Sequence, residues 1–116
     1  LAMKPIIIKN SFVPKLFSWF FPVSAITLFP FIFVADKEAE DWLIIHETIH
    51  IKQYIELLIV GFPILYLLDF LRGLWKYKKV ADAYHSIRLE QEAYRNEGNP
   101  YYLEERTWFA WRKYEI

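Results

Sequence analysis

The chain has 116 residues, a length that suits one domain with one modest core. Its 14 basic and 14 acidic residues cancel, so we expect no nucleic-acid partner. The absence of cysteine excludes disulfides and thiolate metal sites. Hydrophobic residues make up 55% of the chain and aromatic residues 20%, which is high for a small domain, so we expect part of the surface to meet membrane lipid or a membrane protein.

The first third of the chain favours strands over a membrane-spanning helix. Three consecutive isoleucines within residues 4–10 predict a short strand. Residues 16–35 are uncharged and nominally long enough to cross a bilayer, but Pro22 and Pro30 would break such a helix twice. Residues 26–34 are rich in strand formers, with a proline that an edge strand tolerates. We expect a strand-containing segment here, with a spanning helix as the alternative.

The rest of the chain predicts helices. Asp36 can cap a first helix whose first turns are rich in acidic residues. We expect Gly61-Phe62-Pro63 to bend or end this helix. Residues 57–68 form a second apolar stretch, but as a helix it extends only about 18 Å, short of a bilayer core of about 30 Å. We therefore expect it to be buried or half-embedded.

Two further helices are predicted towards the C-terminus. Residues 81–97 form one, closed by Gly98, and Asn99-Pro100 is typical of the start of a last helix. Between the helices, a basic cluster runs from Arg72 to Lys79 and favours a solvated helix end over contact with lipid headgroups. The expected fold is mainly α (α+β), with three to four helices and a short N-terminal strand region.

The first predicted helix contains the motif His-Glu-x-x-His, formed by His46, Glu47 and His50. Positions four apart share one helix face, so the two imidazoles could bind one metal ion, with Glu47 beside it. Zinc suits two imidazoles and one carboxylate, an arrangement that leaves a fourth position for water with a pKa near 7. Glu47 is then the candidate base.

The third ligand must come from elsewhere, and Glu90 and Glu92 are the candidates. Two residues turn a helix by about 200°, so only one of them can reach the metal. Glu90 shares its face with Tyr94 and Glu97, whereas Glu92 lies on the face of His85. This reasoning leaves both open, and we expect His85 to be a surface or core residue.

A resemblance bears on this choice. HETIH followed some forty residues later by EQEAY resembles the gluzincin metallopeptidases, and among them the CAAX prenyl endopeptidases and their bacterial heat-shock relatives, which carry His-Glu-x-x-His and then Glu-x-x-Ala-Asp. The chain is also similar to the short peptidases called minigluzincins. The likeness covers residues 36–97, and it implies zinc ligands at His46, His50 and Glu90, with Glu47 as the base.

One position departs from the family pattern. Tyr94 stands where those families have Asp, and we expect its hydroxyl to hydrogen-bond a ligand or a transition-state oxyanion. In gluzincins an edge strand just before the first motif receives the substrate backbone. Residues 31–34 are similarly placed, so we expect them to form that edge.

The sequence thus predicts a single zincin-like domain over residues 1–116, a small membrane-associated zinc metallopeptidase acting on a peptide or protein. The competing hypothesis is a non-enzymatic component of a membrane assembly, with a structural metal or none, and a third is an inactive remnant serving as an interaction module. If both apolar stretches spanned a membrane, His50 and Glu90 would lie on opposite sides. The metal hypothesis therefore requires residues 57–68 to stay on one side or to line a cavity.

Overall fold

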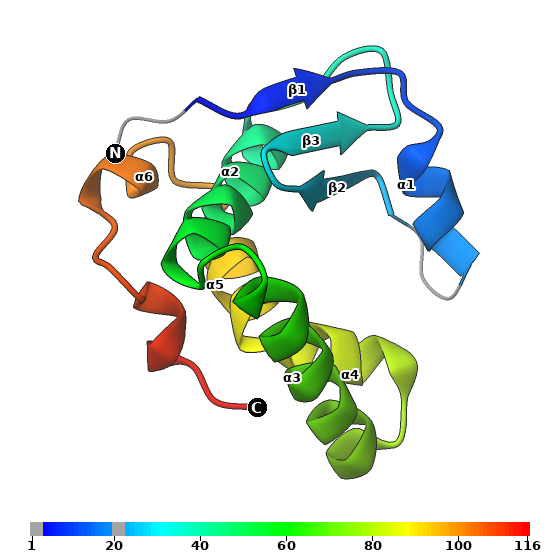
Figure 1. The fold of residues 1–116 in the computed structure, drawn as a ribbon, viewed down its shortest axis with the longest axis vertical. Coiled ribbons are helices and arrows are strands. Elements are labelled where there is room, and N and C mark those ends of the chain that lie inside the picture. Colours follow the sequence, from blue (N-terminus) through cyan, green and yellow to red (C-terminus); the bar gives the residue numbers. More distant parts are fainter. Residues whose placement is uncertain (1–3, 20–22) are drawn as a thin grey trace.

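The computed structural model describes residues 4–19 and 23–116 and has a mainly helical α+β fold, which confirms the predicted fold class (Figure 1). The elements in chain order are β1 (Ile6–Ile8), α1 (Val13–Leu16), the 3₁₀ helix η1 (Phe17–Trp19), β2 (Ala25–Leu28), β3 (Phe31–Val34), α2 (Asp41–Glu56), α3 (Gly61–Tyr77), α4 (Val80–Ser86), α5 (Arg88–Asn96), α6 (Tyr102–Glu105) and the 3₁₀ helix η2 (Ala110–Lys113). The described residues contain more helices than the three to four predicted.

The three strands form one sheet in the order β1-β3-β2. β1 is parallel to β3 and β2 is antiparallel to it, so residues 31–34 form the middle strand and the prediction of an edge strand there was wrong. The strand-forming run splits at a turn containing the cis bond before Pro30, and its first half, β2, lies at the edge. These strands also exclude the alternative of one spanning helix over residues 16–35, of which Pro22 lies outside the described residues.

Helix α2 begins later than predicted. Its N-cap is Glu40, and the bend at Asp36 precedes it, so Asp36 does not cap the helix. The chain leaves α2 through a turn in which Leu58 and Ile59 have positive φ, and α3 then starts at Gly61. The chain therefore bends where a bend or an end was expected, and Gly61 begins the next helix.

Among the described residues, no single helix has both the length and the apolar character needed to cross a bilayer. Helices α2 and α3 meet those two criteria only when taken together, and the chain bends by 110° between them.

The predicted helix over residues 81–97 is two helices. Ile87 is fully buried in an extended conformation between α4 and α5, and the carboxylate of Asp69 accepts the backbone N–H of Arg88 at the start of α5. The predicted last helix is likewise broken into α6 and η2, with Arg106 extended between them. Burial of these side chains outweighs continuous helical hydrogen bonding.

Helix α2 lies between two clusters of buried apolar side chains. On one side, Ile32 and Val34 of the sheet pack with Leu43 and Ile51 of α2. On the other, Tyr54 joins a cluster contributed by α3, α5 and η2, whose members include Phe62, Leu89 and Trp111. Figure 1 shows α2 passing between the sheet and α5, so the motif on α2 faces both.

Candidate metal centre

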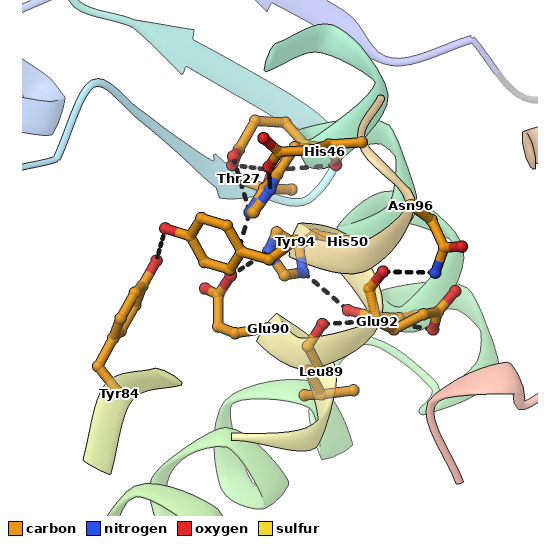
Figure 2. Close-up of polar contacts among 12 residues, drawn as sticks. Thr27, His46, His50, Tyr84, Leu89, Glu90, Glu92, Tyr94 and Asn96 are labelled. Atoms are coloured by element: carbon orange, nitrogen blue, oxygen red, sulfur yellow. Dashed lines mark hydrogen bonds and ion pairs between the residues drawn. The ribbon is translucent and has the colours of Figure 1, made fainter. Parts of the chain in front are cut away.

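His46 and His50 project from α2 towards Glu90 on α5 (Figure 2). The carboxylate Oε1 of Glu90 lies 3.1 Å from the Nε2 atom of each imidazole. All three residues are buried, and one potential ligand atom from each lies within 4.8 Å of the other two. This group could hold a metal ion.

The far nitrogen of each imidazole has its own partner. His46 Nδ1 lies 2.8 Å from Oε1 of Glu97, and His50 Nδ1 lies 2.7 Å from Oε1 of Gln53. Gln53 donates from its Nε2 to the carbonyl oxygen of Leu89, which keeps its amide oxygen directed at His50. In a neutral imidazole, both acceptors favour the tautomer with hydrogen on Nδ1, which leaves the Nε2 lone pair directed into the group.

Glu90 is held on its other oxygen by Tyr66 of α3, whose hydroxyl donates to Oε2 at 2.7 Å. Burial alone would raise the pKa of Glu90, but the neighbouring His50 and His46 hold that pKa well below its usual value. Burial likewise lowers the pKa of His50, yet the carboxylate of Glu90 raises it to about 9. The group thus joins an ionised carboxylate to two imidazoles away from water.

Glu47 lies beside this group. Its Oε2 is 3.7 Å from Nε2 of His46, and its Oε1 accepts a hydrogen bond of 2.9 Å from the hydroxyl of Thr27 on β2. Burial raises the pKa of Glu47, although His50 and His46 oppose that shift. A buried carboxyl group of raised pKa is suited to accept a proton near neutral pH.

Glu92 points away from the imidazoles, on the other side of α5 (Figure 2). It accepts hydrogen bonds from Gln53, from Tyr102 and from Arg106. Of the two carboxylates left open by the helix geometry, only Glu90 joins the group with His46 and His50.

The hydroxyl of Tyr94 contacts a second tyrosine. It lies 3.0 Å from the hydroxyl of Tyr84, while its ring packs edge-on against His46 with centroids 4.5 Å apart (Figure 2). The Tyr94 hydroxyl thus makes no hydrogen bond to His46, His50 or Glu90, and its support of a transition-state oxyanion stays a prediction. His85 packs against the ring of Tyr94 and is not a member of the group.

A cavity of about 430 Å³ opens beside the group. Glu47, His50 and Glu90 form its polar wall. Residues of β2 border it, and most of the remaining lining is apolar or aromatic, from η1, α3 and the start of α4: Phe17, Phe62, Pro63, Tyr66, Leu67, Phe70 and Val80. The three side chains therefore face a space that could admit a ligand with a large apolar group.

The residues that hydrogen-bond to the candidate ligands and to Glu47 differ in how well the sequence predicts them. Gln53 lies one turn after His50, so helical spacing alone places it near its partner. Glu97 follows α5 and meets His46 of α2 only because these two helices pack together. Thr27 and Tyr66 come from β2 and α3, and no local pattern connects them with the motif.

Comparisons with protein families, curated proteins and solved structures gave no match to this chain.

Proposed function

We propose that the protein is a zinc metallopeptidase of gluzincin type, with His46, His50 and Glu90 as ligands and Glu47 as the base. The observation that carries the proposal is the approach of Glu90 Oε1 to both Nε2 atoms at 3.1 Å. Two ligand atoms bound about 2.0–2.1 Å from a tetrahedral zinc ion lie about 3.3 Å apart, which is close to the separation of the Glu90 oxygen from each imidazole nitrogen. The Nδ1 partners of both histidines also fit, because zinc-binding imidazoles donate their other N–H to an oxygen.

The donor set favours a catalytic zinc site over a structural one. A structural site is closed by four protein ligands, whereas a catalytic one keeps a position open. Within residues 4–19 and 23–116, no fourth His, Cys, Asp or Glu belongs to the group, and the cavity adjoins it.

Each neighbouring side chain has a role in the proposed reaction. When bound, zinc supplies Lewis acidity towards water and a peptide carbonyl. Glu47 takes the proton of the attacking water and passes it to the departing amine, and the Thr27 hydroxyl orients its carboxylate. Glu97 and Gln53 fix the rings of His46 and His50.

The edge strand β2 is the proposed site for the substrate backbone. The hydroxyl of Tyr54 donates to the carbonyl oxygen of Thr27, so that carbonyl points away from β3 towards the cavity side of the strand. An extended peptide added along β2 would run past Glu47, in the manner of strand addition. This assigns to β2 the role that the sequence suggested for residues 31–34.

The proposal is tested with Glu47→Gln. This change keeps the size of the side chain but removes the proton acceptor, so we expect bound zinc to stay stoichiometric while peptide cleavage falls by at least about a hundredfold. Metal is measured by elemental analysis and cleavage with a peptide library read by mass spectrometry.

His46→Ala is the matched control, and it should lose both zinc and cleavage. A wild-type protein that binds zinc but cleaves no peptide would support the non-enzymatic alternative. Loss of zinc in Glu47→Gln would instead make Glu47 a ligand.

A further inference from the structure

Helix α3 presents apolar side chains to solvent along its length. Its inner face, with Phe62, Asp69 and Gly73, is buried. Its outer face carries five large apolar residues at helical spacing, with exposed fractions between 47% and 81%: Ile64, Leu67, Leu68, Leu71 and Trp75. We call these five residues the outer α3 face. A helix with apolar residues on the side away from the protein needs a second partner.

The charges at the end of this helix indicate the partner. The acidic residue of α3, Asp69, is fully buried and paired with Arg88, so the exposed charges of the helix, Arg72 and Lys76, are positive. Lys78 and Lys79 follow directly, and Nζ of Lys78 lies 4.7 Å from the centroid of the Trp75 ring. Apolar residues ending in tryptophan and lysine suit the boundary between acyl chains and anionic headgroups.

The cavity borders the same face. Leu67 belongs to the outer α3 face and also lines the cavity, together with Pro63 from the same helix. Figure 1 shows α3 and α4 side by side, extending from the body of the protein away from the sheet. A surface that covered the outer α3 face would therefore lie beside the cavity.

We propose that the outer α3 face binds the surface of an anionic lipid bilayer, with α3 lying in the interface, and that the cavity takes apolar peptide segments presented at that surface. The second part rests on the peptidase function proposed above, and the first part does not. Apolar burial holds the helix in the interface, and the cluster of Arg72, Lys76, Lys78 and Lys79 contributes electrostatic attraction.

Vesicle binding tests the first part. Wild-type protein is sedimented with vesicles of phosphatidylcholine alone or mixed with phosphatidylglycerol. We expect binding at least about tenfold tighter to the mixed vesicles, weakened by salt. The double variant Leu68→Glu/Leu71→Glu should lose about tenfold or more of that affinity. Tyr101→Glu/Trp108→Glu changes two exposed aromatic residues outside α3 and should bind as the parent does.

An unchanged circular dichroism spectrum and an unchanged urea unfolding transition establish that the α3 variant is folded. Equal binding of the variant and the parent, or no binding to either vesicle, overturns the proposal. Self-association of the parent without vesicles, abolished by the same two changes and accompanied by no lipid binding, assigns the face to a second copy of the chain and also overturns it.

Cleavage tests the second part. One apolar peptide is prepared with and without an acyl anchor, and active protein is assayed with mixed vesicles. The anchored peptide should be cleaved about tenfold faster than the free one by the wild type, and this advantage should vanish in Leu68→Glu/Leu71→Glu, whose two positions do not line the cavity. No preference for the anchored peptide overturns this part. Failure to cleave either peptide refutes the peptidase function and leaves the vesicle result standing.

Discussion

Gln53 connects the candidate metal centre with the buried charges behind it. Its amide oxygen faces Nδ1 of His50, and its Nε2 donates to Oε1 of Glu92 and to the carbonyl oxygen of Leu89. The side chain is fully buried, so water cannot replace these contacts. Its orientation, and with it that of the imidazole, is set from α5.

Replacing Gln53 by Met keeps most of its volume but removes both polar ends. We expect zinc affinity to fall by about 10–100-fold, because partners of a metal-binding imidazole orient it and set its tautomer. Competition with a chromophoric chelator measures the affinity. Glu97→Gln keeps an oxygen acceptor for His46 and should change the affinity much less, and equal losses in the two variants would contradict the role given to Gln53.

At the scale of elements, the packing of α3 on α4 depends on Gly73. A Cβ atom added there would lie 2.4 Å from Oγ of Ser86 and 2.8 Å from Cα of Ala83. The second distance involves backbone, so the two helices must move apart to admit it. The close packing of α3 against α4 thus requires glycine at position 73.

Gly73→Ala should therefore destabilise the fold by about 1–3 kcal/mol, even though alanine is the better helix former. Urea unfolding gives the free energy. Gly98→Ala is the matched control, since nothing lies within 4 Å of a Cβ atom there, and we expect its stability to stay within about 0.5 kcal/mol of the parent. A neutral Gly73→Ala would mean that the helices are more loosely packed than the distances indicate.

A second prediction at this scale concerns Arg106, between α6 and η2. Its guanidinium lies 2.8 Å from Glu56 of α2 and 2.6 Å from Glu92 of α5, and all three side chains are buried. Arg106→Leu would leave two carboxylates buried without their cation, and we expect a loss of about 3–5 kcal/mol in the free energy of unfolding. Denaturant titration measures it. The exposed Arg112→Leu should be near neutral, and a similarly small effect of Arg106→Leu would refute the buried ion network.

At the scale of the whole molecule, the candidate metal centre joins α2 to α5, which lie about forty residues apart in the chain. An ion bound there favours the folded state alone, because the unfolded chain does not hold the three ligands together. At a free zinc concentration of 100 times Kd this adds about 2.7 kcal/mol of stability.

Removal of the metal by a chelator should lower Tm by about 10 °C or more for a domain of this size, and added zinc should restore it. Differential scanning calorimetry measures both. In His46→Ala the chelator and zinc should leave Tm unchanged. If the Tm of the wild type does not change on removal or addition of zinc, the group binds no zinc.

Helical periodicity allows the positions of several site residues to be predicted from the sequence. The spacing of His46 and His50 places them on one face of α2 wherever α2 packs, and two residues of separation put Glu90 and Glu92 on different sides of α5. Periodicity does not predict the break between α4 and α5 or the central position of β3. They depend on contacts over long separations, such as Asp69 with Arg88 and β1 with β3.

The sequence by itself determined the mainly helical class, the motif on α2 and the two carboxylates that could complete it, because each follows from local period and residue chemistry. Only the tertiary structure decided that Glu90 is the carboxylate beside the imidazoles, and that Thr27 and Tyr66 support the group. The direction in which α5 faces is set by the burial of Leu89 and Ala93 and by the ion network around Glu92, and such packing is a property of the whole chain.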